Sequence, residues 1–377
     1  MKVAITHDWL VTYGGGERVL QQLLVLYPDA DIYTLVYDRK RMASFFPPER
    51  VHVSRLQRLP MATRLYTKML SLMPGVWEDF DLTGYDLVLS SSSSCAKGVI
   101  TRPDVPHVAF IHSPMRYAWD LYYDYYARSG LLTRLFMKRW IPALRQWDYV
   151  SSQRIDCIVA NSHYVARRIR KFWGRDAVVV NPPVNTSGLS PNGLGDEGFY
   201  LAFSRMVSYK RLDLAIQACG RTGRKLVVIG GGSQEKELKK LAASFKGVDI
   251  RFTGRIPDEE VKSYLQRCRA LLFCAQEDFG IIPVEAQACG RPVIAYGSGG
   301  ALETVVDGKT GVFFDRQDVD SRLDALERFE RLEGEGAFVP SAIAEHAASF
   351  SEARFRDQMA AVIAKTVQSV KGQGGTL

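Results

Sequence analysis

Two glutamates separated by seven residues, Glu277 and Glu285, are the first candidates for ligand binding in this sequence. They enclose the apolar stretch DFGIIPV, in which Pro283 favours the first turn of a helix. A helix is therefore predicted to begin at or just before Pro283, with Glu277 in the preceding loop and Glu285 in the first helical turn. Free main-chain N–H groups around Gly280 and Ile281 would then point out of the helix start.

An anion such as a diphosphate could bind these N–H groups, because the start of a helix carries partial positive charge. Carboxylates accept hydrogen bonds from hydroxyl groups, so an acid on each side could bind one sugar ring. The resulting order of ribose, diphosphate and hexose is that of a nucleotide sugar. For Glu285 alone a simpler interpretation stays open, since acids are favoured in the first turn of any helix.

Two cations in one loop offer a second contact for a diphosphate. Arg205 and Lys210 lie five residues apart, directly after the apolar segment FYLAF. Such a pair could clamp a diphosphate, although ordinary surface charge is the commoner explanation. A third loop, Gly14, Gly15 and Gly16, follows the first apolar segment and opens a helical pattern. Its N–H groups also suit a phosphate, but a tight turn is the simpler interpretation.

Parallel strands are needed to bring such loops together, and the sequence predicts two sets of them. Short, continuously apolar segments alternate with helical patterns, as expected for strands buried on both faces. The segments are residues 2–6, 32–37, 85–90, 107–112 and 157–161 in the first half, and 199–203, 225–230, 249–254, 270–275, 292–297 and 311–314 in the second. An α/β fold with two doubly wound parallel sheets follows, and ligands bind such sheets at the carboxyl ends of strands.

The length and one polar stretch predict two domains. A chain of 377 residues is too long for one core. Residues 183–197 are rich in Pro, Gly, Asn and Ser, which indicates a linker. We therefore expect an amino-terminal domain over 1–183 and a carboxy-terminal domain over 198–351. A long final helix, about 352–370, is expected to pack back on the first domain.

The charge of the chain is uneven. Residues 1–187 contain 24 Lys and Arg against 16 Asp and Glu, whereas the remainder contains 25 of each, so the whole net charge of +8 lies in the first half. This asymmetry predicts an anionic partner, and we favour a phosphorylated substrate and a membrane surface over nucleic acid. Segments 55–74 and 131–147 mix basic with aromatic and aliphatic residues, as interfacial helices do. Amphipathic helices packed on their own sheet have the same composition.

Several other classes of protein are disfavoured. No apolar run reaches the roughly 18 residues of a bilayer-spanning helix. The first ten residues, MKVAITHDWL, predict a buried strand rather than a secretion signal. Six scattered cysteines without a CxxC pair indicate reduced thiols in a cytoplasmic protein. Three Asp-x-Asp triplets lie outside the loops described above, so neither a metal nor another cofactor is expected.

Together these motifs resemble the retaining glycosyltransferases of family 4, which have the GT-B fold of two Rossmann-like domains facing across a cleft. The family's Glu-seven-residues-Glu element stands here as Glu277 and Glu285. Its Arg-four-residues-Lys element stands as Arg205 and Lys210, and its glycine-rich first loop as residues 14–16. The elements occur in the family's order and cover nearly the whole chain.

A further histidine belongs to the same resemblance. His112, in FIHSPMRYAWD, matches the histidine that follows a strand of the family's amino-terminal domain. This segment, with HDWLVTYGGGERVL, IYTLVYD and YKRLDLAI, is similar to bacterial mannosyltransferases of O-antigen and exopolysaccharide assembly. One departure is Asn185, where many relatives have Asp, and we expect it to affect the hinge more than the chemistry.

The resemblance implies a role for each motif. Arg205 and Lys210 would neutralise the leaving diphosphate, whereas Glu285 would bind the ribose. Glu277 would bind the hexose, and His112 would contact it from the other domain. The implied catalytic residues are therefore His112, Arg205, Lys210 and Glu277. The donor-binding set adds Gly15, Gly16, Phe279, Gly280, Ile281 and Glu285, with the nucleobase expected on main-chain groups around Gly254, Arg255 and Ile256.

The resemblance also implies a reaction. A hexose, mannose from GDP-mannose, would move with retention onto a lipid-linked oligosaccharide in bacterial surface polysaccharide synthesis. The enzyme would be peripheral, at the inner face of the plasma membrane. No metal and no cofactor other than the nucleotide-sugar donor is expected.

Four alternatives stay open. The donor could be another nucleotide hexose, such as UDP-glucose or UDP-N-acetylglucosamine. A sugar-nucleotide epimerase or hydrolase would need an acid/base pair, for which only His112 and Glu277 are candidates. A nicotinamide-dependent enzyme would need a glycine at Glu235 of the turn GGGSQE. A non-catalytic sugar-nucleotide-binding module would not need the cation pair.

Overall fold

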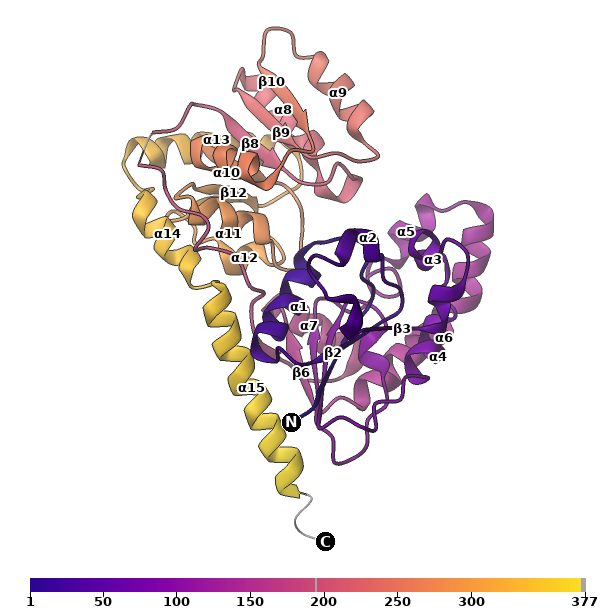
Figure 1. Cartoon of the computed structure of the whole chain (residues 1–377). Helices are drawn as coiled ribbons and strands as arrows, with labels where there is room; N and C mark the ends of the chain where they lie inside the picture. The colour runs from indigo at the N-terminus through magenta and orange to yellow at the C-terminus, as the bar shows by residue number, and fades with distance from the viewer. Residues whose placement is uncertain (194, 374–377) are drawn as a thin grey trace. The chain divides into compact units, whose positions relative to one another are not determined.

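The computed structural model describes residues 1–193 and 195–373 of the chain. The chain forms two compact units, each built around one parallel sheet (Figure 1). The amino-terminal unit comprises Met1–Pro183 together with the chain from Phe355 onward, and the carboxy-terminal unit comprises Val184–Arg354. The predicted α/β fold with two doubly wound parallel sheets is confirmed.

Seven strands form the sheet of the amino-terminal unit, in the order β3-β2-β1-β4-β5-β6-β7. Their bounds are β1 Val3–His7, β2 Asp31–Thr34, β3 Val51–Val53, β4 Leu87–Ser92, β5 His107–Ile111, β6 Cys157–Ala160 and β7 Val178–Val179. Five of them coincide with predicted apolar segments. The edge strands β3 and β7 were missed, because three and two residues carry too little pattern to be recognised.

Helices and short 3-10 turns connect and cover these strands. The helices are α1 Gly15–Leu26, α2 Arg39–Met42, α3 Ala62–Leu65, α4 Met73–Glu78, α5 Tyr122–Arg128, α6 Leu131–Gln153, α7 His163–Trp173 and α15 Glu352–Gln373. The 3-10 turns are η1 Pro48–Arg50, η2 Arg55–Arg58, η3 Tyr66–Lys68 and η4 Ala96–Gly98. In α15, Phe355, Met359 and Ile363 repeat every four residues and are buried in the same core as β1 and β5.

The basic segment 55–74 is not one amphipathic helix, so that interpretation was wrong. It consists of η2, α3, η3 and the start of α4, and Met61 at the start of α3 has a left-handed φ of 54°. Pro60 and Pro74 also interrupt the helical pattern, since proline lacks the N–H that a helix interior needs. Ala62 and Met73 are buried in the core of the amino-terminal unit, so much of the apolar stripe packs internally.

The carboxy-terminal unit holds six parallel strands in the order β10-β9-β8-β11-β12-β13. The strands are β8 Tyr200–Phe203, β9 Leu226–Ile229, β10 Ile250–Gly254, β11 Ala270–Phe273, β12 Val293–Tyr296 and β13 Gly311–Phe314. The connecting elements are η5 Ser208–Lys210, α8 Leu212–Thr222, α9 Glu235–Ala243, α10 Asp258–Arg267, α11 Ile281–Ala288, α12 Ala301–Thr304, α13 Val319–Gly334 and α14 Pro340–Ala348. All six strands coincide with predicted segments, and apolar clusters bury both faces of the sheet.

Each sheet has a point where the order of strands reverses. In the amino-terminal unit β1 lies between β2 and β4, and in the carboxy-terminal unit β8 lies between β9 and β11. The loops that leave the two central strands at such a point diverge to opposite faces, which opens a crevice at the carboxyl edge of the sheet. Each unit therefore offers one topologically favoured ligand position.

Candidate active site

The reversal point of the carboxy-terminal sheet brings two predicted residues into contact. Lys210 follows β8 and Glu277 follows β11, and β8 and β11 are neighbours in the sheet. Nζ of Lys210 forms an ion pair with Oε1 of Glu277, although 67 residues separate them. The side chains are 11% and 21% exposed, so solvent still reaches the pair. An ammonium group has three N–H donors, so Lys210 keeps two for a phosphate.

Arg205 lies at the start of the same loop and is exposed. One of its guanidinium nitrogens, Nη2, donates a hydrogen bond to the hydroxyl of Tyr209 at 3.0 Å. Across residues 1–193 and 195–373, no carboxylate pairs with Arg205. Most of its N–H donors are therefore available to an anionic ligand.

The helix after Glu277 begins earlier than predicted. Its first residue is Ile281, and Gly280 caps it with a φ of 92°, a conformation that side chains with a Cβ rarely adopt. Glu285 therefore lies beyond the first turn, which contains no acid. The prediction of a first-turn position for Glu285 was therefore wrong, since Glu285 lies one residue beyond that turn. The general preference for acids in a first turn consequently does not explain this residue.

The other residues near this helix that were predicted to bind the nucleotide-sugar donor differ in which of their groups are exposed. The ring of Phe279 is buried and packs against Phe350, with ring centroids 5.6 Å apart, so only its main chain is available to a ligand. Ile281 and Glu285 are half-buried. Gly254 ends β10, and its carbonyl accepts the N–H of Gly230 at 2.9 Å.

Two glycines that sequence analysis passed over fix the loop around Glu277. The N–H of Gly300 donates to the carbonyl of Glu277 at 2.8 Å, and Gly299 pairs with Glu277 in an isolated bridge. A Cβ on Gly299 would overlap the carbonyl oxygen of Glu277, and one on Gly300 would overlap the main chain of Phe279. The glycine pair that follows the predicted strand at 292–297 was the signal that could have identified them.

The turn GGGSQE, considered above as a nicotinamide motif, has a packing function. A Cβ on Gly230 would overlap the carbonyl oxygen of Ser204, and one on Gly232 would overlap that of Met206. Both glycines therefore let the β9 loop lie against the loop of Arg205. A Cβ on Gly231 would lie 3.6 Å from Arg255, so the exposed Arg255 borders the same region. Ile256 packs on the edge of the core.

In the amino-terminal unit, the structure brings the glycine loop and His112 together. Gly14 caps α1, and Gly15 and Gly16 form its first turn. A Cβ on Gly16 would lie 3.5 Å from Cε1 of His7 and 3.6 Å from Nε2 of His112. Nε2 of His112 also hydrogen-bonds to the hydroxyl of Ser91 at 2.8 Å. Burial and the neighbouring His7 lower the pKa of His112 to about 4, so its imidazole is neutral near pH 7.

A buried carboxylate that sequence analysis missed organises the loop after β4. Asp8 accepts hydrogen bonds from the main-chain N–H groups of four consecutive residues at 2.6 to 2.9 Å; they are Ser93, Ser94, Cys95 and Ala96. A charged carboxylate is stable there because these dipoles replace its hydration. The pattern of an acid ending a strand, followed by a serine run ending another, was the available signal.

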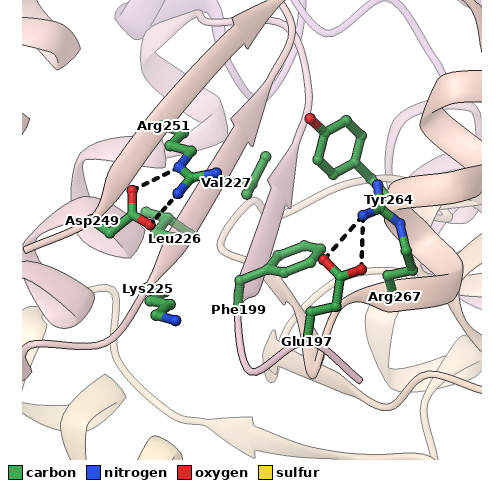
Figure 2. Close-up of a pocket in the computed structure, with 9 residues that line it drawn as sticks. All are labelled: Glu197, Phe199, Lys225, Leu226, Val227, Asp249, Arg251, Tyr264 and Arg267. Carbon is green, nitrogen blue, oxygen red and sulfur yellow. Dashed lines mark hydrogen bonds and ion pairs between the residues drawn. The ribbon is translucent and has the colours of Figure 1, made fainter. Parts of the chain in front are cut away.

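A pocket of about 210 Å³ in the carboxy-terminal unit does not belong to this site (Figure 2). It lies at the amino ends of β8, β9 and β10, whereas the motifs lie at the carboxyl ends. Its guanidinium groups are already paired, Arg251 with Asp249 and Arg267 with Glu197, as the dashed lines show. We assign no role in the reaction to this pocket.

In the part of the chain that the structure describes, no three His, Cys, Asp or Glu side chains cluster as a metal site requires. The expectation that no metal is needed stays a prediction. Likewise, none of the described helices is both long and apolar enough to cross a bilayer.

Comparison with known proteins defines the class. The family model "Glycosyltransferase Family 4" matches residues 13–187, and the model "Glycosyl transferases group 1" matches residues 190–350. The two matches together cover nearly the whole chain. The chain belongs to the family 4 glycosyltransferases and has the GT-B fold.

Two curated relatives are mannosyltransferases. The GDP-mannose-dependent alpha-(1-6)-phosphatidylinositol monomannoside mannosyltransferase of Mycolicibacterium smegmatis is 32% identical over 198 residues, which cover 45% of this chain and 52% of the relative. The O-antigen chain mannosyltransferase C of Escherichia coli is 26% identical over 302 residues, covering 75% and 76% of the two chains. The chain spans about half the length of the first relatives it matches.

Solved structures share the fold at low identity. Anabaena HepE in complex with UDP and glucose superimposes with a TM-score of 0.70 at 17% identity, over 97% of this chain and 99% of that one. Sucrose-phosphate synthase from Thermosynechococcus elongatus gives a TM-score of 0.74 at 16% identity, over 98% and 100%. At such identities the likeness supports the fold alone.

Proposed function

We propose that this glycosyltransferase transfers mannose from GDP-mannose, with retention, onto a lipid-linked oligosaccharide acceptor. The observation that carries the proposal is the contact between Lys210 and Glu277 at the reversal point of the carboxy-terminal sheet, with the exposed Arg205 in the same loop. The choice of mannose is supported by similarity to the two mannosyltransferases described above.

The geometry suits cleavage of a bond between a sugar and a diphosphate. As that bond breaks, the diphosphate gains negative charge and the sugar becomes positively charged, so both ends need stabilisation. Arg205 and the two remaining N–H donors of Lys210 would stabilise the leaving diphosphate. Glu277 would bind hydroxyl groups of the hexose on the other side of the same ammonium group. Glu285, half-buried on α11, would bind the ribose.

The neutral state of His112 fits a contact with the sugar. A protonated imidazole would repel a sugar that gains positive charge, whereas a neutral one can hydrogen-bond to a hydroxyl group without that cost. Burial keeps the pKa of His112 at about 4, which gives the neutral form over the whole physiological range. We therefore retain His112 as the contact from the amino-terminal unit.

A membrane-facing surface is the second part of the proposal. The first turns of α6 expose Leu131, Leu132 and Leu135, which are 75%, 82% and 57% accessible. Lys138 and Arg139 are exposed on the next turn. Exposed leucines beside cations favour the interface of an anionic membrane, at the inner face of the plasma membrane. A lipid-linked acceptor would be concentrated there.

The experiment is incubation of the chain with GDP-mannose and a short lipid-linked or soluble acceptor. Glycosylated acceptor would support the proposal, whereas epimerised donor or free mannose alone would indicate an epimerase or hydrolase. The main alternative donor is a uridine nucleotide, since the structural neighbour HepE is in complex with UDP and glucose. Stronger thermal stabilisation by UDP-glucose than by GDP-mannose would favour that alternative.

A further inference from the structure

Four side chains in the amino-terminal unit form a continuous hydrogen-bonded chain, which we call the imidazole relay. Oε1 of Glu17 lies 3.3 Å from Nε2 of His7, whose Nδ1 lies 3.1 Å from Oγ of Ser91. The same Oγ lies 2.8 Å from Nε2 of His112. The members come from α1, β1, β4 and the residue after β5, so four separate elements converge on this chain.

One end of the imidazole relay is buried, and the other end is accessible to a ligand. Ser91 is fully buried, and His7 and Glu17 are 4% and 8% exposed. His112 is half-buried, and nothing within residues 1–193 and 195–373 hydrogen-bonds to its Nδ1. Nδ1 of His112 is therefore the nitrogen of the imidazole relay that a ligand can reach.

The chemistry of the groups limits where each proton of the imidazole relay can lie. Burial alone would raise the pKa of Glu17, but its interactions with His7 and its backbone hydrogen bond lower the pKa overall, so Glu17 is ionised and can only accept. Nε2 of His7 must therefore carry a hydrogen. In the direction proposed below, Nδ1 of His7 accepts the hydroxyl hydrogen of Ser91. The oxygen of Ser91 then accepts a hydrogen from Nε2 of His112.

We propose that Glu17, His7 and Ser91 are positioning residues that hold His112 as its Nε2–H tautomer and so present Nδ1 as a hydrogen-bond acceptor to a hydroxyl of the transferred sugar. The proposal rests on the sugar contact assigned to His112 above. Asp8 is a further charged group near His112, and its oxygens are occupied by the four main-chain N–H groups of the β4 loop. It therefore does not compete for the protons of the relay.

The same strand supplies a matched control. Ser90, one residue before Ser91, points to the other face of β4, and its hydroxyl hydrogen-bonds to Nε2 of the buried His107 at 2.7 Å. Ser90→Ala thus removes one buried hydroxyl from the imidazole of His107, whereas Ser91→Ala removes one from the imidazoles of both His7 and His112. Only Ser91→Ala interrupts the relay.

Nitrogen NMR of histidine-labelled protein tests the tautomer directly. The chain has six histidines, and loss of one signal in His112→Gln assigns His112. We expect the unprotonated nitrogen of native His112 to be Nδ1. Ser91→Ala should shift His112 toward a mixture of tautomers, and Ser90→Ala should leave it unchanged. A native His112 that is protonated on Nδ1 would overturn the proposal, and this spectrum is informative even if a variant does not fold.

Kinetics separate this inference from the proposed function. With GDP-mannose, Ser91→Ala should lower kcat/KM roughly tenfold, about the effect of one hydrogen bond, whereas binding of free GDP should not change. Equal losses in Ser91→Ala and Ser90→Ala would indicate a structural role only and contradict the proposal. If His112→Gln is fully active, the sugar contact fails, while the NMR result still decides whether the relay fixes the tautomer.

Discussion

The two units use polar groups in opposite ways. In the carboxy-terminal unit, Arg205 is exposed without a carboxylate partner in the described part of the chain, and the Lys210–Glu277 pair is still reached by solvent. In the amino-terminal unit, the imidazole relay is buried except at the half-buried His112, its members are joined by hydrogen bonds, and His112 is neutral. A leaving group that gains negative charge needs cations that are held ready and not already neutralised. A sugar that becomes positive is better served by a neutral imidazole than by a protonated one.

The largest effect on turnover is expected for Arg205, which has no carboxylate partner among the described residues. Arg205→Ala should lower turnover roughly 10²- to 10³-fold, because a preorganised charge on the leaving diphosphate is lost. Arg221→Ala is the matched control, since Arg221 is an exposed arginine of the same unit that pairs only loosely with Asp320, at 3.7 Å. Initial rates with GDP-mannose would measure both. Similar rates for the two variants would place the leaving diphosphate elsewhere.

The proposed diphosphate contact at the start of α11 can be tested at two glycines that both have a positive φ. Gly280→Ala and Gly308→Ala both place a side chain at positive φ, 92° and 72°, and each should cost about 1–3 kcal/mol in the free energy of unfolding. A Cβ at Gly308 meets no atom within 4 Å, whereas one at Gly280 would lie 3.3 Å from Phe273. Only Gly280→Ala should also weaken GDP binding, as measured by calorimetry. Unchanged GDP affinity in Gly280→Ala would exclude a diphosphate at this helix start.

As the pH is lowered, the amino-terminal unit should lose stability at a higher pH than the carboxy-terminal unit. Burial lowers the pKa of His107 to about 3 and that of His112 to about 4, against 6.5 in an unfolded chain. The unfolded state therefore binds more protons below pH 6.5, and stability falls as the pH drops from 6.5 toward 4. In the carboxy-terminal unit, the hydrogen bond with Arg224 lowers the pKa of Glu330 from 4.5 to about 2, so its contribution is lost only between those values.

The tryptophans make this difference measurable. All six lie in residues 1–173 and so report on the amino-terminal unit, whereas circular dichroism reports on both units. On acidification, tryptophan fluorescence should change at a higher pH than the ellipticity. His107→Gln should bring the two transitions closer together. Coincident transitions in the native chain would show that the units do not differ in this way.

The smallest effect is expected at the exposed leucines of α6. Replacing Leu132 and Leu135 with Ser should weaken binding to anionic vesicles several-fold, and added salt should weaken it further by screening Lys138 and Arg139. Val25→Ser is the control, because Val25 is 56% exposed on α1 of the same unit. Sedimentation with vesicles would measure all three proteins. Vesicle binding that is insensitive to both the leucines and salt would contradict the proposed surface.

Much of the fold could be predicted because its cause is local in sequence. Continuous apolar segments such as 225–230 and 270–275 contain strands, since short runs of this kind are typical of strands buried on both faces. The segment 55–74 was misjudged because spacing alone does not show where Pro60 and Met61 interrupt a helix. The edge strand Val178–Val179 carries too few residues to form a pattern.

The candidate site could be predicted in its residue types but not in its contacts. Lys210 and Glu277 were each identified from a motif, whereas their ion pair depends on the neighbouring positions of β8 and β11. The roles of Asp8 and Ser91 depend on main-chain and imidazole partners about 85 and 21 residues away, which spacing does not reveal. Helix boundaries are equally hard to locate, and the position of Glu285 was misplaced for that reason.

The central claim is that Glu277 binds the hexose beside Lys210 and that Glu285 binds the ribose. Calorimetry of GDP with Glu277→Gln and Glu285→Gln tests it most directly, because GDP has a ribose and no hexose. Glu277→Gln should retain the GDP affinity of the native chain, or exceed it since Lys210 is released, while kcat falls roughly 10²-fold. Glu285→Gln should weaken GDP binding by about 1–3 kcal/mol. Loss of GDP affinity in Glu277→Gln together with full affinity in Glu285→Gln would contradict the account.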